Sequence, residues 1–538
     1  MDLALQRYAL CVGGLLLLLL TSRFIYRYRG HLHPLQTAFR LQFLYRNIGR
    51  LPIPIAVWSV CFLAANIFIL FKSPTLRSVR AGYLVIFNIQ PLLLAVHSDV
   101  LIDLLGASRQ SYFFFHRAAA WTTAVLTAFH SIGMVLNGRS FSFRSIGNIL
   151  AFSAACAVQL LILASFGFFR NRFYEVFIVL HYCLAASTAV GIAWHLRSVF
   201  DFWNPGYLEV YCVSFVTVFL ILCVYRTSYL ISRNLKGGRL ASVSVRPSDC
   251  DTVAIKVTVN LPRPLRVAAG QYINLTVPSL DASSSIQSHP FVVTSWSKHR
   301  QKSLDLFVER RRGFTRKLHL ADSHEGRHAI VSGPFGRRVS LLEFDFVLLL
   351  ASGYGIAAQA AYLRELVSGG NRQKAHLVWL ISKRDIVNPA GKWLLNPVLD
   401  QDTRKARSIL ILVRTQLTGL QMMLISIFDN VGSLEGTPSA ADSTVAKTFG
   451  GRARLYKGKP DLKAIIRKGM QDCLREERSP NGRLLLLVSA TLEARLHVKQ
   501  ALRSYLQELK AGSDSRTSYG CRNHSIDVSI EELDFQPE

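Results

Sequence analysis

The sequence predicts a multidomain membrane protein with three parts: an all-α transmembrane helical bundle, a small β-barrel and a doubly wound α/β domain. Three observations predict this architecture. Apolar residues crowd into the first 225 positions of the 538-residue chain, short alternating runs begin near residue 238, and strand–turn–helix units begin near residue 345. We place the domains at 1–226, with a core at about 82–226, at 238–341, and at 342–538 with a C-terminal tail.

Hydropathy predicts seven membrane spans. They cover about 4–22, 55–71, 82–105, 112–136, 147–169, 173–196 and 207–225. The first span could be a signal peptide. TSRFIYRYRG follows its leucine run in place of a small-residue cleavage site, however, and this favours a retained anchor.

The basic residues of the loops predict the orientation of these spans. The first loop and the fifth loop, which carries Arg170 and Arg172, are rich in arginine, and the positive-inside tendency places both in the cytosol with the soluble half of the chain. The bias is modest, because several basic residues then lie outside: Lys72, Arg77, Arg80, Arg139 and Arg144.

Charge and cysteine usage narrow the function classes. The net charge is +29, but it is spread over both halves of the chain and has a topological explanation in the loops, so we expect no nucleic-acid partner. Six of the nine cysteines fall in apolar spans and none shows CxxC spacing. Neither a disulfide framework nor a zinc site is indicated.

Two apolar stretches each carry two histidines fourteen residues apart: His116 and His130, then His181 and His195. Fourteen residues is close to four helical turns, so both histidines of a stretch lie near one face, roughly 21 Å apart. Two such helices side by side present facing imidazoles near each side of a bilayer about 30 Å thick, and haem iron accepts two axial imidazoles. The sequence therefore predicts two haems, with His116 and His181 as the inner pair and His130 and His195 as the outer pair. His97 has no counterpart, and we expect it to pack.

The soluble half begins with antiparallel strands. RLASVSVRP, TVAIKVTVN and AGQYINLTVP alternate in polarity and end at proline or glycine, which predicts a barrel. FVLLLAS, HLVWLIS, ILILVRT and RLLLLVSAT then predict the core strands of a parallel sheet, with helices between them. The polar stretch at 433–445 is expected to be a surface insertion.

Gly353 and Gly355 follow the first of these parallel strands. Such a glycine pair lets backbone amides at a helix start approach a pyrophosphate, but many doubly wound sheets use one for packing alone. The barrel contributes a more specific set of motifs, namely GQY at 270–272, HPFVVTSW at 289–296, RRRGFT at 310–315 and SGPFG at 332–336.

Together these residues resemble the ferric reductase transmembrane components of fungi, a family related to the catalytic subunits of NADPH oxidases. The resemblance covers nearly the whole chain. It implies a haem-binding helical bundle, a ferredoxin-reductase-like barrel that binds FAD, and a nucleotide domain that binds NADPH. It also implies an integral, multi-pass protein of the plasma membrane with cytosolic soluble domains.

The resemblance implies a role for each matching residue. The four paired histidines correspond to the family's ligands of two b-type haems. Contacts with FAD are implied for His289, Pro290, Phe291, Thr294, Ser295, Gly313 and Thr315. Contacts with the nicotinamide nucleotide are implied for Gly333, Pro334, Gly336, Gly353, Gly355, Ile356 and Ala357.

The chain departs from the family pattern at two functional places. Ser489, Ala490 and Thr491 stand where the family usually carries a Cys-Gly-Pro turn near the nicotinamide. The end of the chain, SIEELDFQPE, lacks the usual terminal tryptophan, which leaves Phe535 as the aromatic candidate to stack on the flavin. How the nicotinamide is positioned therefore stays open.

The implied function is transmembrane electron transport, from cytosolic NADPH through FAD and two haems to an acceptor across the membrane. Ferric or cupric chelates are the expected acceptors, so the chain is an NADPH-dependent metalloreductase in which no side chain acts as an acid or base. Three alternatives stay open: a superoxide-forming oxidase, a reductase of an organic metabolite, and a homologue without enzymatic activity.

Two further expectations concern specificity. Lys383 and Arg384 follow the second sheet strand, where doubly wound domains sense the ribose 2′ position, so we expect NADPH over NADH; a solvated turn is the alternative. The short outside loops are basic and offer Asp201 as their single carboxylate. They should attract anionic metal chelates rather than bind bare ferric ion.

Overall fold

The computed structural model describes residues 47–533, apart from several gaps. The gaps are 49–50, 73–76, 106–108, 139–140, 198–205, 248–253, 282–283, 286, 312, 321–325, 337, 369–373, 383, 402–422, 430–445, 449–452, 458–459, 475–482 and 515–526. The chain divides into two compact units, Met1–Tyr229 and Leu230–Glu538, and each is described by itself.

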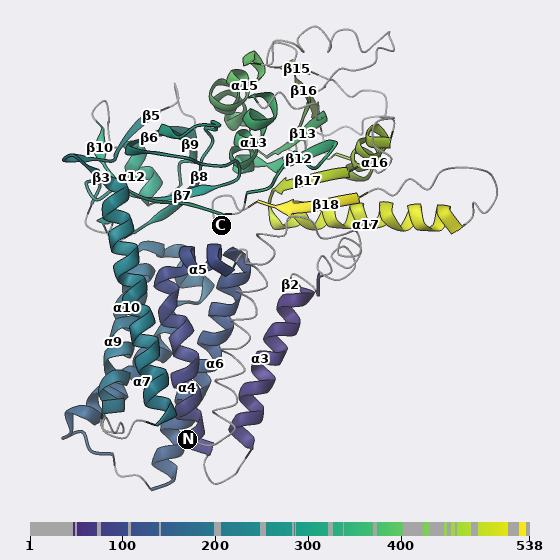
Figure 1. The fold of residues 1–538 in the computed structure, drawn as a ribbon. Coiled ribbons are helices and arrows are strands. Elements are labelled where there is room, and N and C mark those ends of the chain that lie inside the picture. The colour runs from purple at the N-terminus through teal and green to yellow at the C-terminus, as the bar shows by residue number, and fades with distance from the viewer. Residues whose placement is uncertain are drawn as a thin grey trace. The chain divides into compact units, whose positions relative to one another are not determined.

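The first unit is a bundle of apolar helices (Figure 1). Five segments are long and apolar enough to cross a membrane: Arg77–Ile102, Ser111–Leu136, Ile146–Ala164, Tyr174–Arg197 and Tyr207–Asn234. They match five of the seven predicted spans. The span predicted at 55–71 forms α3 (Ile53–Phe71), whose described apolar stretch is shorter, and the span at 4–22 lies outside the described residues.

One predicted span is interrupted. Residues 82–105 form α4 (Arg77–Leu93), a 3₁₀ turn at Leu94–His97 and α5 (Ser98–Leu105) rather than one helix. Pro91 lies in the last turn of α4, where it removes a backbone donor and disfavours further α-helix. The carbonyl of Val96, in the 3₁₀ turn, accepts a hydrogen bond from Arg226 of α10 (Tyr207–Asn234).

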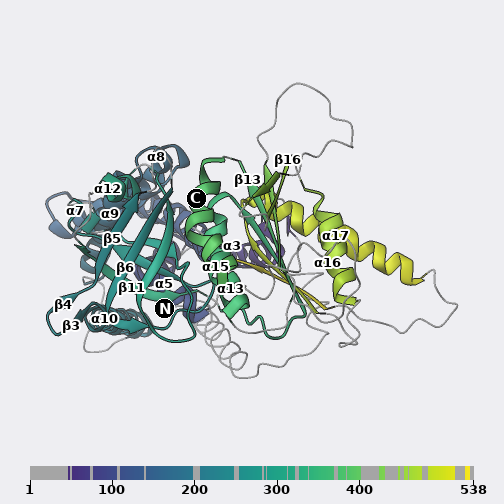
Figure 2. The same ribbon diagram turned by 90° about the horizontal axis from the view of Figure 1, so that it is seen from above.

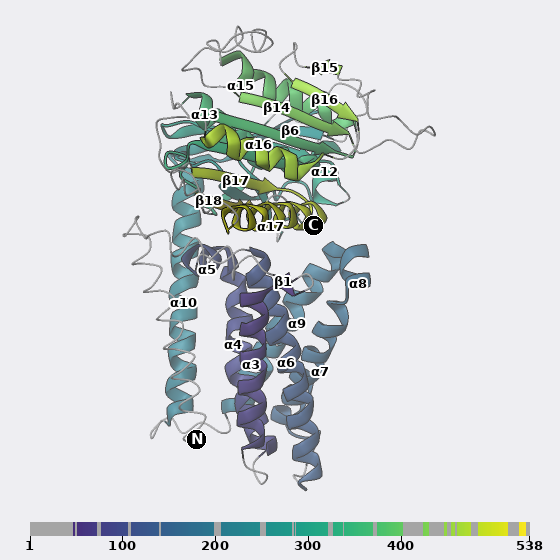
Figure 3. The same cartoon turned by 90° about the vertical axis from the view of Figure 1, so that its right-hand side faces the viewer.

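A buried polar pair joins α3 to α4. Asn88 donates its side-chain N–H to the side-chain oxygen of Asn66 at 2.8 Å, and both residues are 2% exposed. In an apolar surrounding an unpaired amide is costly, so this bond fixes the register of the two helices. Figure 3 shows α3 beside α4.

The second unit begins with an antiparallel barrel, as predicted. Two sheets, ordered β10-β5-β6-β9 and β11-β7-β8, are joined by a bridge between Val293 and Leu306 and share one apolar core. Alternate residues point inward, as the sequence pattern requires. The strands are β5 (Ser242–Pro247), β6 (Ala254–Leu265), β7 (Tyr272–Thr276), β8 (His289–Val292), β9 (Gln301–Glu309), β10 (Arg327–His328) and β11 (Ile330–Phe335).

The remainder of this unit is a seven-stranded sheet ordered β15-β16-β14-β13-β12-β17-β18, parallel except for β15. Its strands are β12 (Phe346–Ser352), β13 (Lys374–Ile381), β14 (Met423–Asp429), β15 (Ala446–Thr448), β16 (Ala453–Lys457), β17 (Arg483–Ser489) and β18 (Asp527–Glu532). Helices α13 (Ile356–Ser368) and α15 (Asn396–Gln401) cover one face, and α16 (Leu462–Leu474) and α17 (Leu492–Asp514) the other (Figures 2 and 3). The doubly wound fold is confirmed.

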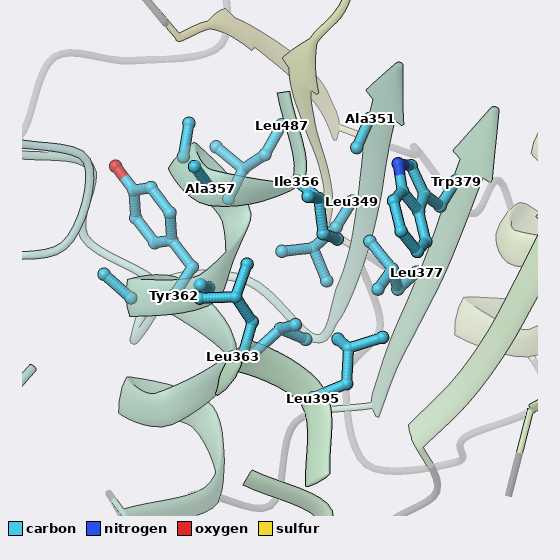
Figure 4. Close-up of a cluster of buried hydrophobic side chains, with 14 of the residues drawn as sticks. Leu349, Ala351, Ile356, Ala357, Tyr362, Leu363, Leu377, Trp379, Leu395 and Leu487 are labelled. Carbon is cyan, nitrogen blue, oxygen red and sulfur yellow. The ribbon is translucent and has the colours of Figure 1, made fainter. Parts of the chain in front are cut away.

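Apolar side chains between the sheet and α13 form the core of this domain. Leu349 and Trp379 of the strands pack against Ile356 and Leu363 of the helix, and all four are fully buried (Figure 4). The predicted strand ILILVRT lies outside the described residues. β13 pairs with β12 on one side and with β14 on the other, and β14 was not predicted from the sequence.

Candidate functional site

The structure brings the four predicted histidines together in the predicted pairs. His116 and His130 lie on α6 (Arg109–Leu136), and His181 and His195 lie on α9 (Tyr174–Arg197). The ring centroids of His116 and His181 are 6.3 Å apart, and those of His130 and His195 are 6.5 Å apart. The two helices therefore present two pairs of facing imidazoles, four turns apart along each helix.

The separation within each pair fits a shared metal. A first-row metal lies about 2.0–2.1 Å from an imidazole nitrogen that binds it, which is itself about 1.1 Å from the ring centre, so two imidazoles across one iron have centroids about 6.3 Å apart. Both measured separations agree with this value. The residues present thus fit a bis-imidazole haem at each pair.

The outer pair has a close neighbour that the sequence analysis missed. Gly82 of α4 lies against His130, where an added Cβ would come within 2.8 Å of the ring. The Nδ1 atom of His130 lies 2.8 Å from the backbone carbonyl oxygen of Ser78, also on α4. Nothing in the sequence marks a glycine on an apolar helix as the neighbour of a particular histidine.

Small residues bring the helices close enough to set these positions. A Cβ at Gly133 of α6 would lie 2.8 Å from Cβ of Ser78, and a Cβ at Gly191 of α9 would lie 2.6 Å from the carbonyl oxygen of Leu150 on α7 (Ile146–Ala164). Such contacts let backbones approach closely within a membrane. Gly133 and Gly191 lie three and four residues, about one turn, from the outer histidines His130 and His195.

The inner pair has a different environment. The Nδ1 atoms of His116 and His181 are buried and have no hydrogen-bond partner within the described residues. Aromatic rings flank the pair: Phe177 lies 5.4 Å from His181, and Phe113 lies 6.4 Å from His116, between centroids. No short polar contact fixes either inner ring in the part of the chain that the structure describes.

His97 takes the packing role expected for it. It is 3% exposed, its Nε2 lies 3.6 Å from the Sγ of Cys223, and its ring lies 5.5 Å from that of Phe219. Both neighbours belong to α10, so His97 fills a helix contact at the 3₁₀ turn.

The described residues predicted to contact the flavin lie on β8, just after β8, and around the start of α12 (Phe314–Leu320). The His289 ring stacks on Phe314 with centroids 4.2 Å apart, and Gly313 enters the helix with φ of +80°, a conformation that favours glycine. The Thr315 hydroxyl accepts the backbone N–H of Arg311 at 2.8 Å. Stacking and this hydrogen bond together shape the turn.

Two other residues predicted to contact the flavin form hydrogen bonds within the barrel. The hydroxyl of Thr294, which is 1% exposed, donates to the backbone carbonyl of Asp305 at 2.9 Å. The hydroxyl of Ser295 accepts the N–H of Asp305 at 3.1 Å. Both hydroxyls link the end of β8 to β9, and Phe291 is buried in the barrel core. Pro290 is half-buried.

The GPFG segment closes β11 with a glycine at each end. Gly333 has φ of +116° and Gly336 has φ of +96°, with Pro334 between them. The carbonyl of Gly336 accepts a hydrogen bond from the side chain of Gln271 at 3.3 Å. The predicted GPFG and GQY segments are therefore in contact.

The glycine loop lies at the switch point of the parallel sheet. Gly353–Gly355 form a 3₁₀ turn between β12 and α13, which begins with Ile356 and Ala357. β13 and β17 pair with opposite sides of β12, so the strand order reverses at β12. Open α/β sheets commonly bind a ligand in a crevice at the carboxyl ends of the strands at such a point, here β12 and β17. The unusual Ser489–Thr491 turn follows β17 at this same edge.

The two turns at the switch point touch. The hydroxyl of Ser489 donates to the carbonyl of Gly355 at 2.9 Å, and the N–H of Thr491 donates to the hydroxyl of Ser352 at 2.8 Å. A Cβ at Gly355 would lie 2.0 Å from the Ser489 carbonyl oxygen. Gly355 is thus required for this approach, whatever binds in the crevice.

Tyr354, between the two loop glycines, packs against the barrel. Its ring stacks on Phe307 of β9 with centroids 5.5 Å apart, and Trp393 meets the same Phe307 edge-on at 6.1 Å. Burial, and to a lesser degree Glu309 nearby, raises the pKa of the Tyr354 phenol, which therefore stays protonated at neutral pH.

The remaining predicted residues are placed only in part. Arg384 begins the 3₁₀ turn Arg384–Ile386, which follows the carboxyl end of β13. Lys383, Asp201 and Phe535 lie outside the described residues.

Two family models match the chain. Residues 81–192 match the ferric reductase like transmembrane component, and residues 236–339 match an FAD-binding domain. The first range contains both histidine pairs except His195, and the second contains β5 to β11. The recognition of a ferric-reductase type membrane domain followed by an FAD-binding barrel is therefore confirmed.

Curated relatives of the chain are also named as ferric or ferric/cupric reductases. Ferric reduction oxidase 3, mitochondrial, of Arabidopsis thaliana is 26% identical over 53% of this chain and 38% of its own length. A probable cell surface ferric reductase of Aspergillus oryzae is 25% identical over 59% of the chain and 44% of its own length. Ferric/cupric reductase transmembrane component 2 of Saccharomyces cerevisiae is 28% identical over 44% and 32%. The matched part thus spans less than half the length of these relatives.

Solved structures resemble the chain only distantly. A flavohemoglobin from Malassezia yamatoensis gives a TM-score of 0.37 at 11% identity, covering 88% of this chain and 98% of that one. A ferredoxin NADP+ reductase from Neisseria gonorrhoeae gives 0.30 at 14% identity, covering 54% and 97%. At these TM-scores neither structure bears on function.

Proposed function

We propose that this chain, whose membrane domain and barrel match the ferric reductase like transmembrane component and FAD-binding families, is a transmembrane oxidoreductase. It moves electrons from cytosolic NADPH, by way of FAD and two b-type haems, to ferric or cupric chelates across the membrane. The plasma membrane is its proposed location.

The geometry of the histidine pairs carries this proposal. Apolar side chains would pack the interior of an apolar bundle at a lower free-energy cost than four imidazoles do. Packing alone therefore does not explain two pairs of facing histidines. Their separations of 6.3 and 6.5 Å fit iron at both sites, and four helical turns separate the sites along the direction in which electrons must cross.

The soluble unit is proposed to hold FAD and NADPH. The turn around Gly313 and strand β8 would hold the FAD, and the crevice beside Gly353 and Gly355 would hold the nucleotide pyrophosphate at the start of α13. When bound, NADPH supplies hydride to the flavin, and flavin and haem supply one-electron chemistry.

In this proposal the residues of the chain bind and orient the cofactors. The imidazoles would hold iron, and the backbone amides at the start of α13 would donate hydrogen bonds to phosphate. The Tyr354–Phe307 stack holds the glycine loop against the barrel. No acid or base acts on the acceptor in this proposal, because the transferred species is an electron.

The acceptor side is proposed to favour anions. Arg77, Arg144 and Arg197 lie exposed at the ends of α4, α7 and α9 that the orientation places outside. Arg197 lies over the ring of Trp194, 5.6 Å from its centroid, beside the outer histidine His195. A basic rim of this kind attracts an anionic metal chelate by long-range electrostatics.

The test is a difference spectrum of membranes that contain the full chain. NADPH should reduce two low-spin haems, and ferric citrate should reoxidise them while ferrous ion appears. Absence of haem, or haem that NADPH never reduces, would remove the proposal. Superoxide formed as fast without chelate as iron is reduced with it would move the assignment to an oxidase.

A further inference from the structure

The two histidine pairs differ in what holds their rings. In the inner pair, both Nδ1 atoms are buried without a hydrogen-bond partner among the described residues. In the outer pair, Nδ1 of His130 lies 2.8 Å from the carbonyl oxygen of Ser78. The pairs have the same residue types and nearly the same separation, and the contact between His130 and the Ser78 carbonyl is one way in which they differ.

The contact determines which ring nitrogen of His130 carries hydrogen. A backbone carbonyl can only accept a hydrogen bond, so Nδ1 must be the donor and Nε2 keeps its lone pair. That lone pair is what a metal requires of a neutral imidazole. The donated bond also makes the ring a stronger electron donor, as second-shell partners of metal-bound histidines do.

Two glycines allow this contact. A side chain at Gly82 would meet the His130 ring at 2.8 Å from one ring atom and 2.9 Å from Nδ1 itself. A side chain at Gly133 would meet Cβ of Ser78 at 2.8 Å and push the carbonyl away from the ring. The Asn137 amide donates to the Ser78 hydroxyl at 3.0 Å, a bond that does not involve the Ser78 carbonyl.

We propose that Gly82 and Gly133 are positioning residues that hold the Ser78 carbonyl against Nδ1 of His130, and that this contact sets the donor strength of one ligand of the outer pair alone. The inference rests on the proposed function, because it takes the four histidines to be haem ligands. Two haem sites with the same ligands, two imidazoles each, would not differ because of their ligands alone. The Ser78 contact gives a physical cause for a difference between them.

The experiment is a potentiometric titration of full-length protein in membranes, with low-temperature electron paramagnetic resonance on the same samples. Gly82→Ala should raise one of the two haem midpoint potentials and shift one of the two low-spin signals, because a weaker imidazole donor stabilises ferric iron less. Gly133→Ala should act in the same direction. The second potential should stay at its wild-type value in both variants.

Three controls use the same chain. Gly147→Ala adds a Cβ whose nearest neighbours are 3.6 Å away, so both potentials should stay unchanged. Ser78→Ala keeps the carbonyl and loses the Asn137 contact, and the spectrum should change little. Gly82→Ala added to His195→Ala, which keeps the inner pair, should leave the single remaining haem unaffected.

Each result decides the matter. If wild-type membranes hold no haem, the proposed function itself fails. If two haems are present and Gly82→Ala and Gly133→Ala leave both potentials unchanged, the positioning role is wrong while the function stands. If a glycine variant loses one haem, the role is supported when the remaining haem matches that of His195→Ala; loss of both, or of the inner one, contradicts it.

Discussion

Ser489 and Gly355 are hydrogen-bonded at the carboxyl ends of two central strands of the parallel sheet: the hydroxyl of Ser489 donates to the carbonyl of Gly355 at 2.9 Å. Ser489 is fully buried, so its hydroxyl serves this bond and not a ligand. The residue that stands in place of the expected cysteine thus stabilises the glycine loop. The altered turn is compatible with an intact nucleotide crevice.

Gly355→Ala should slow NADPH oxidation. The new Cβ would lie 2.0 Å from the Ser489 carbonyl oxygen, so the loop or β17 must move. We expect a loss of at least about tenfold in kcat/KM for NADPH, which is about 1.4 kcal/mol, with both haems retained. The rate of dye reduction by the full-length protein, at several NADPH concentrations, measures this kcat/KM. Gly167→Ala, whose Cβ meets open space, is the matched control, and a wild-type rate in Gly355→Ala would contradict the placement of the nucleotide.

Replacing one histidine of a pair should remove one haem. His181→Ala should lose the inner haem and stop transfer across the membrane, while NADPH oxidation by the flavin with soluble dyes continues; His195→Ala should lose the outer haem. Haem content by pyridine haemochrome measures both. His97→Phe, which changes a packing histidine, should keep two haems. Two haems with an unchanged low-spin spectrum in His181→Ala would refute the pairing.

Arg384→Glu should reverse the choice of nucleotide. The residue begins the turn after β13, where a cation stabilises a 2′-phosphate and a carboxylate accepts hydrogen bonds from a ribose 2′-hydroxyl. We expect the ratio of kcat/KM for NADPH over NADH to fall by about tenfold or more, equal to about 1.4 kcal/mol. Steady-state rates with both nucleotides measure it, and an unchanged ratio discards the role.

Reduction of ferric citrate should slow as salt rises. Screening shortens the reach of the exposed basic side chains to about 10 Å at 0.1 M and about 3 Å at 1 M ionic strength. Arg144→Glu should raise KM for the chelate and flatten this dependence, since it reverses a charge on the outer side. Rates across a salt series measure both. A wild-type rate that is independent of salt would exclude electrostatic attraction of the chelate.

Acid should weaken the nucleotide domain through His376. Burial, with Lys468 nearby, lowers the pKa of this β13 histidine from 6.5 to about 4, so the folded protein keeps it neutral. Between pH 6.5 and 4 the unfolded chain binds a proton that the folded chain does not, and stability falls as pH falls. His376→Gln should flatten the dependence of thermal stability on pH in this window. The exposed His299→Gln should not, and an equal effect of both changes would contradict the assignment.

Much of the architecture could be predicted from the sequence because its patterns are strong. Long apolar runs and a fourteen-residue histidine period each follow from helix geometry, so the pairing of His116 with His181 and of His130 with His195 was accessible without coordinates. The barrel strands alternate, and β12 is a continuous apolar run that ends at glycine.

The remaining features depend on tertiary contacts that leave no local pattern. Gly82 matters because a histidine 48 residues away lies against it, and the Thr294 hydroxyl donates to the Asp305 carbonyl on β9. The break in the third predicted span does have a local cause in Pro91, which the hydropathy average conceals because it weighs apolar character alone. Strand β14 was missed because the neighbouring run ILILVRT is the more apolar of the two.

The spacing of the histidines also places the transferred electron in an electric field. Four helical turns correspond to roughly 21 Å, about two thirds of a hydrocarbon layer about 30 Å thick. A membrane voltage of 100 mV is worth about 2.3 kcal/mol for one charge across the whole layer, and so about 1.6 kcal/mol between the two histidine levels. Under the proposed function an inside-negative cell drives each electron outward, every turnover depolarises the membrane, and sustained reduction requires a compensating flow of cations out or anions in.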